Sequence, residues 1–418
     1  MLIEAIHFAK KATYSSTPNP RVGCVIHNSS LTAQGHTQPR GYAHAEVMAL
    51  RDAAAKGISV KGATAYVSLE PCSHFGRTPP CCHALIDAGI AKVVIAILDP
   101  NPLVAGQGVQ MLRDAGIEVD VLPTDSAEAV ASRELNIGFF SRMIRKTPWV
   151  RMKIAASLDG QTALANGASQ WITGAAARSD GHAWRARACA VLTGIGTVLQ
   201  DDPLLDVRQV ATPRQPHLVI VDSNLDTPLN AKLWSTLGKV PSSQGGPSAG
   251  VNIAAVGNAV VGNAETNSVA AKKHELNFGL SAEVLASIPG RSIIIYAAQP
   301  NPAKQKALEA LGATVVLLPE ADSSKVDLHA MMLDLGQREI NELHVEAGFK
   351  LNGSLINAGM VDELVIYTAP KLLGPGMGMA NTPALAALAD AVQLQFKSAE
   401  MVGEDLRIVA RVQGRDQF

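Results

Sequence analysis

The chain has 418 residues and a net charge of −1, with 47% apolar and 17% charged residues. This composition is typical of packed globular domains, and at roughly 100–200 residues per domain the length predicts two or three of them. Because 36 Lys and Arg balance 37 Asp and Glu, and only 4% of residues are aromatic, a nucleic-acid-editing or nucleic-acid-binding role is disfavoured.

No apolar run reaches about 18 residues, so we expect no transmembrane helix and no membrane partner. The N-terminus lacks the basic start, the long apolar stretch and the small-residue cleavage site of a signal peptide. The five cysteines are too few for a disulfide framework, and three of them cluster with histidines. These features favour a cytoplasmic protein that binds a metal.

The first part of the chain alternates between helical and strand patterns. Turn residues such as those at 17–20 separate the elements. Helical periodicity covers residues 2–13, 47–54, 82–88 and 109–115, and strand patterns cover residues 22–27, 63–69, 93–98 and 117–121, with a hairpin partner near 32–35. This alternation predicts an α/β unit of about 145 residues.

Residues 146–148 (Lys-Thr-Pro) indicate a domain boundary, so we expect domains at 1–146 and 147–418. After it the alternation restarts, and residues 392–413 resemble an antiparallel pair at a sheet edge. Strand patterns lie at 149–155, 190–193, 218–221, 292–296, 314–318, 343–346 and 363–368. The second domain is therefore expected to be mostly parallel α/β. Residues 239–289 differ in composition and predict an elaborated loop, partly of poor order.

The sequences His44-Ala45-Glu46, Pro71-Cys72 and Cys81 point to a metal site. One imidazole and two thiolates are a standard ligand set for zinc, and three protein ligands leave one position open, as catalysis requires. Zinc at such a site lowers the pKa of bound water to about 7. Cys72 follows a predicted strand and Cys81 begins a predicted helix, where amide dipoles favour thiolate. We expect His44 in or just before the first helical turn, so that Glu46 reaches the same place as a general acid/base.

A purely structural zinc site is the alternative, and it would need a fourth protein ligand. Cys82 is a poor candidate, because it points about 100° away from Cys81 on a helix, and we interpret it as a small buried residue. His74 lies within the loop between the two cysteines, and we place it at the mouth of the pocket.

Several motifs resemble those of the bifunctional riboflavin-biosynthesis deaminase/reductase family. They include Asn-Pro-Arg-Val-Gly-Cys-Val at 19–25, the long Cys72–Cys81 loop with Gly-Arg-Thr-Pro-Pro inside it, and Asp-Pro-Asn-Pro at 99–102. Further likeness lies at 156–160, 169–173, 196–203, 345–348, 361–364 and 369–371. The resemblance covers nearly the whole chain except about residues 239–289.

This resemblance implies an N-terminal cytidine-deaminase-like three-layer domain and a C-terminal dihydrofolate-reductase-like α/β domain. It implies zinc-dependent hydrolytic deamination of a diaminopyrimidinone ribosylamino phosphate, followed by NADPH-dependent reduction of the ribosyl side chain to ribityl. The expected partners are this phosphorylated pyrimidine and further copies of the chain in a homo-oligomer. Whether NADPH is preferred over NADH, and which group donates the proton in the reduction, stay open.

The resemblance also implies binding residues. For the deaminase it implies Asn19, His74 and Arg77 as substrate residues, although Asn19 in a Pro-rich turn could satisfy only the backbone and Arg77 could be merely solvated. For the reductase, the implied cofactor positions are Ala155, Trp171, Thr197, Asp201, Ser223 and the loop Gly348, Phe349, Lys350, Leu351, Asn352, Gly353 and Ser354. The implied substrate positions are Lys153, Ser169, Arg185, Leu205, Arg208 and Glu346, with Arg185 and Arg208 suited to the phosphate.

The residues themselves say less about the reductase half. The three-glycine dinucleotide fingerprint is missing, because Leu199 stands at its third position. Two strand-to-loop junctions, 193–197 and 346–348, have small residues that let backbone N–H groups approach an anion, although the glycines could serve only tight turns. Phe349, Lys350 and Asn352 depart from the small residues usual in the family, and Lys350 would either meet a cofactor phosphate or crowd it. A deaminase whose C-terminal domain binds nucleotide without reducing anything is therefore the alternative reading.

Overall fold

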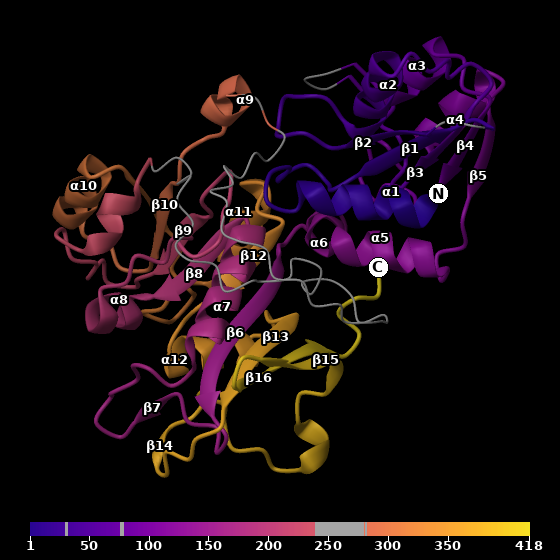
Figure 1. The fold of residues 1–418 in the computed structure, drawn as a ribbon. Helices are drawn as coiled ribbons and strands as arrows, with labels where there is room; N and C mark the ends of the chain where they lie inside the picture. Colours follow the sequence, from indigo (N-terminus) through magenta and orange to yellow (C-terminus); the bar gives the residue numbers. More distant parts are fainter. Residues whose placement is uncertain (30–31, 76–78, 239–279, 281) are drawn as a thin grey trace, which may run out of the picture. The chain divides into compact units, whose positions relative to one another are not determined.

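The structure is a computed structural model that describes residues 1–29, 32–75, 79–238, 280 and 282–418. The contacts between its residues divide the chain into two compact units. Unit 1 comprises Met1–Pro148 together with Gly336–Asn341 and Phe418, and unit 2 comprises Trp149–Leu335 and Glu342–Gln417. Each unit is described by itself below (Figure 1).

Among its described residues, unit 1 contains a five-stranded sheet of order β2-β1-β3-β4-β5. The hairpin partner β2 pairs antiparallel with β1, as the sequence predicted, and β3, β4 and β5 are parallel to one another. The strands are β1 (Gly23–His27), β2 (Thr32–His36), β3 (Thr64–Val67), β4 (Lys92–Ile95) and β5 (Glu118–Val121). Successive side chains of these strands point to opposite faces of the sheet, and buried apolar side chains form a core on both faces.

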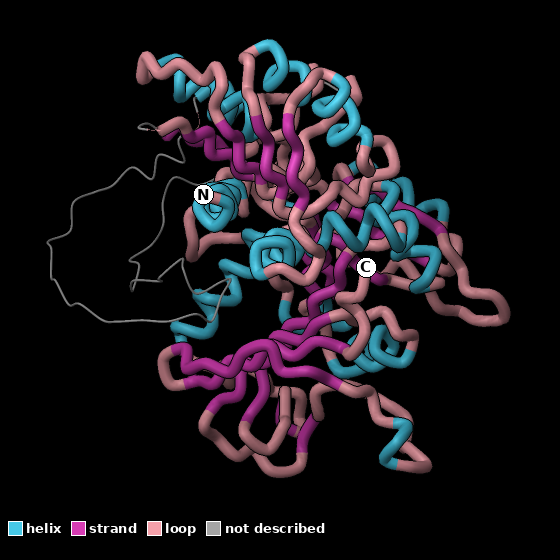
Figure 2. Tube along the Cα trace, turned by 90° about the vertical axis from the view of Figure 1, so that its right-hand side faces the viewer, coloured by secondary structure: helices cyan, strands magenta, loops and turns pink. Residues whose placement is uncertain are grey.

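Helices cover both faces of this sheet, which gives three layers (Figures 1 and 2). α2 packs on β1 and β2 with α3 beside it, whereas α1 packs on β1, β2 and β3 and against α5. The helices are α1 (Leu2–Ala9), α2 (Ala45–Ala55), α3 (Cys81–Asp87), α4 (Gln107–Asp114), α5 (Ala127–Leu135) and α6 (Ile137–Arg145). The three-layer α/β prediction is confirmed, but the sequence reading had not resolved α5 and α6.

Within the described part of unit 2, the main sheet has the order β11-β10-β9-β8-β12-β6-β13-β16-β15. All pairs from β11 to β13 are parallel, and β16 and β15 add an antiparallel edge, as residues 392–413 had predicted. A short pair, β7 and β14, lies apart from the main sheet. The strands are β6 (Trp149–Ser157), β7 (Ala163–Leu164), β8 (Ala190–Gly194), β9 (His217–Val221), β10 (Ile293–Ala297), β11 (Ala313–Leu317), β12 (Glu342–Val345), β13 (Glu363–Ala369), β14 (Gly376–Met377), β15 (Leu394–Val402) and β16 (Asp405–Val412).

The helices of unit 2 connect these strands. α7 packs against β12 and β15, α8 against β8, and α10 against β11. They are α7 (Ala175–Arg187), α8 (Ile195–Asp201), α9 (Ala282–Ser287), α10 (Pro302–Ala310), α11 (Leu328–Gln337) and α12 (Phe349–Asn357). Alternate residues of β9 and β10 form one buried cluster with Leu308 of α10. Strands covered on both faces, as in parallel sheets, are rich in apolar residues. Most of the elaborated loop predicted at 239–289 lies outside the described residues.

The chain leaves neighbouring strands of this sheet in opposite directions. From β8 it continues through α8 to β9 on one side, and from β12 through α12 to β13 on the other. In open parallel sheets, ligands bind at the carboxyl ends of strands where such a reversal occurs. The fold therefore marks the ends of β8 and β12 as a binding region.

Candidate functional site

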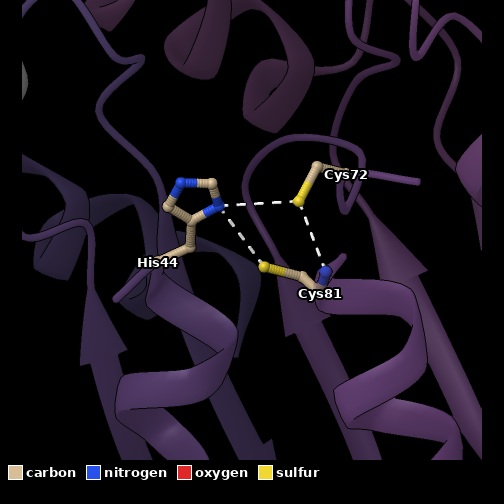
Figure 3. Close-up of side chains that lie close together, drawn as sticks. All are labelled: His44, Cys72 and Cys81. Atoms are coloured by element: carbon tan, nitrogen blue, oxygen red, sulfur yellow. Dashed lines mark hydrogen bonds between the residues drawn. The ribbon is translucent and has the colours of Figure 1, made fainter. Parts of the chain in front are cut away.

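Three side chains converge at the carboxyl end of β3 in unit 1. His44 is the N-terminal cap of α2, Cys72 lies in the loop after β3, and Cys81 is the first residue of α3 (Figure 3). His44 Nδ1 lies 3.5 Å from Cys72 Sγ and 3.4 Å from Cys81 Sγ. One ligand atom from each residue lies within 4.8 Å of the other two. The donor set of one imidazole and two sulfurs fits zinc.

The charges around Cys72 favour its thiolate. The backbone N–H of Cys81, at the start of α3, donates to Cys72 Sγ at 3.3 Å. Hydrogen bonds from the side chains of Cys81 and His44 hold the pKa of Cys72 well below its usual value. The pKa of His44 is raised, chiefly by the same hydrogen bond to Cys72. A thiolate is the form in which cysteine binds a metal.

Glu46 lies in the first turn of α2, as expected, and is buried. Its Oε2 atom is buried and has no hydrogen-bond partner among the described residues. Burial, with the nearby charge of Cys72, raises the pKa of Glu46 to about 7. A buried carboxylate oxygen without a partner is costly to a fold, so this atom marks a place for a proton or a substrate.

Glu70, two residues before Cys72, holds the loop that carries this ligand. Its Oε1 accepts from the backbone N–H groups of Gly108 (2.9 Å) and Val109 (3.2 Å), in the first turn of α4. Its Oε2 accepts from those of Asp99 (3.2 Å) and Gly106 (3.0 Å). The sequence had given no role to Glu70. Its donors lie 29–39 residues away in the sequence, where no local signal links them.

The same loop is also packed tightly against Gly108 and Cys82. A side chain at Gly108 would overlap the carbonyl oxygen of Pro71. Cys82 is buried, as predicted, and its Sγ donates to that carbonyl at 3.4 Å. The backbone N–H of Cys82 donates to Cys72 O at 3.3 Å. Together with Glu70, these contacts set the position of Cys72.

Two of the three predicted substrate residues of the deaminase, Asn19 and His74, lie in described loops of unit 1. Asn19 is half-buried in the turn before β1, and its backbone N–H donates to Ser16 O at 2.9 Å. His74 is half-buried in the Cys72–Cys81 loop, and its Nδ1 is buried without a partner among the described residues. Neither forms a hydrogen bond to the four central residues in the described part of the chain. Arg77 lies outside the described residues.

In unit 2, the two glycine junctions predicted from the sequence lie side by side. Gly194 caps α8 and Gly348 caps α12, each with extended backbone, at the ends of the neighbouring strands β8 and β12. A Cβ atom at Gly348 would lie 3.8 Å from Thr197 Oγ1, and one at Gly194 would lie 3.1 Å from Leu351. A side chain at Gly194 would therefore press on Leu351, whereas one at Gly348 would reach only ordinary contact with Thr197. The N–H groups at the start of α12 suit an anion.

Glu346 and Arg185, both predicted substrate residues, form a part-buried ion pair beside these junctions. The Arg185 guanidinium donates to both carboxylate oxygens of Glu346, with Nη2 at 2.8 Å from Oε2. Arg185 holds the pKa of Glu346 well below its usual value despite burial. Lys153, half-buried, belongs to the same group, because Glu346 opposes the lowering of its pKa by burial. The pair leaves Arg185 less free to hold a phosphate by itself than the sequence had suggested.

The other predicted reductase positions differ in exposure. Leu205 is buried and adopts positive φ, and Arg208 is exposed. Trp171 is exposed beneath the Arg178 guanidinium, 4.6 Å from its ring. The remaining positions lie at strand ends or helix ends and are half-buried or exposed: Ala155 in β6, Ser169 after β7, Thr197 and Asp201 in α8, and Ser223 after β9.

The prediction that residues 348–354 form a loop is wrong, because α12 begins at Phe349 directly after Gly348. Asn352, Gly353 and Leu355 recur at helical spacing and are buried, which explains why this segment is helical. A side chain at Gly353 would overlap the backbone of Asn381, and Asn352 donates to Met379 O at 3.0 Å. Lys350 is exposed. Packing therefore accounts for Gly353 and partly for Asn352.

Comparisons with known proteins agree with both units. A family model described as the cytidine and deoxycytidylate deaminase zinc-binding region matches residues 1–97, and the RibD C-terminal domain matches residues 148–243 and 258–408. The riboflavin biosynthesis protein RibD of Escherichia coli is 39% identical over 97% of this chain and 96% of its own length. That of Haemophilus influenzae is 39% identical over 98% and 96%.

Solved structures of the same type superpose on nearly the whole chain. Acinetobacter baumannii RibD, form 1, has a TM-score of 0.77 and 34% identity, and covers 99% of this chain and 98% of its own. A Thermotoga maritima diaminohydroxyphosphoribosylaminopyrimidine deaminase/5-amino-6-(5-phosphoribosylamino)uracil reductase has a TM-score of 0.72 and 27% identity, over 98% and 97%. The chain therefore belongs to the RibD family and is a bifunctional enzyme of riboflavin biosynthesis, a zinc-dependent deaminase and NADPH-dependent reductase.

Proposed function

We propose that residues 1–146 form the deaminase domain and residues 147–418 the reductase domain, each with the site residues described above. In the first domain His44, Cys72 and Cys81 hold zinc, and Glu46 moves the proton. In the second, the region between α8 and α12 takes NADPH, and Lys153, Arg185 and Glu346 face the phosphorylated pyrimidine. The single observation that carries this assignment is the convergence of three ligand atoms beside a buried, unpartnered carboxylate oxygen.

The deaminase step would use the protonation of Glu46. When bound, zinc would supply hydroxide at neutral pH by lowering the pKa of water to about 7. Glu46, with a pKa of about 7, can take up the proton released from water at Oε2 and pass it to the pyrimidine as the amine leaves as ammonia. Burial keeps competing water away from this carboxyl group. Asn19, His74 and Arg77 would orient the ring and the phosphate.

The reductase step would depend mainly on orientation. NADPH, when bound, supplies the hydride that reduces the ribosyl carbon. The N-terminus of α12, which begins after Gly348 and lies beside Gly194, suits a cofactor phosphate. The Arg185–Glu346 pair fixes the carboxylate, so that it can accept hydrogen bonds from sugar hydroxyls. Burial lowers the pKa of the Lys153 ammonium group. A lowered pKa suits a group that approaches the reacting sugar.

The variant Glu46→Gln tests the deaminase assignment. We expect it to lose deamination by at least about 100-fold while retaining one zinc per chain, since general acid/base catalysis contributes roughly that much. Cys72→Ser is the matched control and should lose both zinc and deamination. Both variants should still oxidise NADPH when the deaminated intermediate is supplied. Loss of zinc from Glu46→Gln would assign this residue to the metal instead of the proton.

The chain is expected to act as a homo-oligomer. Strand β15 lies at the edge of the main sheet, and its apolar side chains Phe396 (73% exposed), Met401 and Leu394 are exposed. An exposed apolar edge is a template for pairing with another chain, and a second copy would cover it. Sedimentation of wild type and Phe396→Lys tests this, since the lysine should shift the oligomer towards monomer.

A cytoplasmic location is proposed for a chemical reason. Cys72 and Cys81 must stay reduced to hold a metal, and a reducing compartment keeps them so. No helix in the described ranges is both long and apolar enough to cross a membrane. Fractionation that found the enzyme in an oxidising compartment would contradict this proposal.

A further inference from the structure

Residues 204–208 of unit 2 are held by side chains instead of by regular secondary structure. The buried Arg291 donates from Nη1 to Leu204 O at 3.0 Å and from Nη2 to Leu205 O at 2.7 Å. Arg185 donates from Nη1 to Asp206 O at 3.0 Å. Three successive carbonyl groups are thus each bound by an arginine, which does not deprotonate in proteins and keeps its donors in a fixed plane.

The next two residues are held by neutral side chains. Val207 N–H donates to Gln215 Oε1 at 2.7 Å, and Gln215 Nε2 donates to Val207 O at 2.8 Å, so one buried amide satisfies both groups of one residue. The backbone N–H of Arg208 donates to His182 Nδ1 at 3.3 Å. His182 can accept only when neutral, and burial, with Arg185 and Arg208 nearby, lowers its pKa to about 3.

These bonds hold a backbone that would not otherwise persist. Leu205 has φ of +50°, a left-handed conformation that is unfavourable for a residue with a branched side chain. Its side chain is buried in the cluster formed with β9 and β10. Such conformations persist where the surroundings over-determine them, and they concentrate at binding sites.

The segment ends by presenting one charged group. The Arg208 side chain is 49% exposed, and its Nη1 donates to Asp206 Oδ1 at 2.8 Å. This bond orients the guanidinium and leaves Nε and Nη2 with no partner in the described parts of the chain. Arg185 connects the segment to the site, because the same guanidinium binds both Asp206 O and the Glu346 carboxylate.

We propose that Gln215 is a positioning residue for substrate binding by the reductase, and that it acts by holding Arg208 where it meets the substrate phosphate. Arg291 and His182 support the same segment from its two ends. The inference rests on the proposed role of Arg208 in substrate binding. Gln215 is buried and bonds Val207 through both Oε1 and Nε2, so it holds the segment from inside the fold.

A double-mutant cycle separates this role from a general contribution to folding. Arg208→Ala should raise KM for the deaminated, phosphorylated intermediate about 30-fold, since it removes a charge-assisted contact. Gln215→Leu, which keeps the side chain's approximate size, should raise KM about 10-fold because Val207 loses both bonds. If Gln215 acts through Arg208, the double variant should stay near 30-fold, instead of the roughly 300-fold expected for independent effects.

Two controls make the readout specific. Gln209→Leu changes the same residue type at an exposed neighbouring position and should leave KM within about twofold of wild type. KM for NADPH should also stay within about twofold in Gln215→Leu, which shows that the unit is folded. With the dephosphorylated intermediate, the effects of Arg208→Ala and Gln215→Leu should both disappear.

The outcomes distinguish this inference from the proposed function. No effect of Arg208→Ala on KM would overturn the assignment of Arg208 and, with it, the inference. A large effect of Arg208→Ala together with an additive or absent effect of Gln215→Leu would overturn the positioning role alone. If Gln215→Leu does not fold, Gln215→Asn, whose shorter side chain cannot keep both bonds to Val207, enters the same cycle, and additivity with Arg208→Ala there would equally refute the inference.

Discussion

Replacing Glu70 by Gln should weaken zinc binding without touching a ligand. The carboxylate accepts four backbone N–H groups, two at each oxygen, from Asp99, Gly106, Gly108 and Val109. Gln keeps one oxygen and places an NH2 group opposite the other two donors. Those donors then lose their acceptor in a buried site, where each unsatisfied group costs about 1–3 kcal/mol.

The expected loss of stability has two sources, the two unsatisfied N–H groups and the lost negative charge at the start of α4. Gly106 is half-buried and can recover part of its loss from water, so the two N–H groups together cost about 2–3 kcal/mol. Removing the negative charge from the first turn of α4 adds about 0.5 kcal/mol. A total near 3 kcal/mol corresponds to a Tm lowered by about 10 °C for the deaminase half. Because Cys72 follows Glu70 by two residues, we expect zinc affinity to fall by about 10–100-fold, as for other residues that support metal ligands.

The assay is competition for zinc with a chromogenic chelator, together with thermal unfolding. Asp125→Asn is the matched control, since it makes the same chemical change at an exposed site, and it should bind zinc like wild type. NADPH oxidation on the deaminated intermediate should be unchanged in both variants and so reports on the other half of the chain. Zinc affinity and Tm both at the wild-type level in Glu70→Gln would refute the anchoring argument.

Three other predictions follow from the same contacts. Gly108→Ala should displace Pro71 and lower zinc affinity about tenfold or more. Its control is Gly116→Ala, at a glycine with positive φ and open space around it, which should cost about 1 kcal/mol of stability with normal zinc affinity. Equal zinc affinities of the two variants would show that the close approach of Gly108 to Pro71 is unimportant. Chelation of zinc should abolish deamination but leave intact the NADPH oxidation measured with supplied deaminated intermediate, and loss of that oxidation as well would contradict independent sites. Burial, with Arg214 and Arg291, lowers the pKa of His217 to about 4, below the usual 6.5 of the unfolded chain. The unfolded state therefore binds the proton more readily, so stability present above pH 6.5 should fall by up to about 1.4 kcal/mol per pH unit between 6.5 and 4. The difference in urea midpoints between wild type and His217→Asn across this range measures this contribution, because other buried histidines such as His182 add slopes of their own.

The metal centre was predictable from the sequence because its chemistry is carried by short motifs at the ends of elements. His44 and Glu46 are two residues apart at a helix start, and the two cysteines lie after a strand and at the start of a helix. Strand and helix periodicities likewise report local burial, so the strands of both sheets and the antiparallel edge could be placed within a few residues. The start of α12 was misplaced because Gly348 and Gly353 suggested a loop, whereas the burial of Asn352 and Leu355 against other parts of the unit decides the helix.

Only the tertiary structure decided which residues that are far apart in the chain contact one another. Sheet order brings β8 beside β12, and so places Gly194 next to α12 although more than 150 residues separate them in the sequence. Glu70 finds its donors in a later loop and helix, and Arg291 reaches back to Leu204 and Leu205. Hydrogen bonds between distant segments have no period and no spacing, because they depend on how the elements pack. The sequence therefore names the chemistry of this enzyme, while packing decides which side chains hold that chemistry in place.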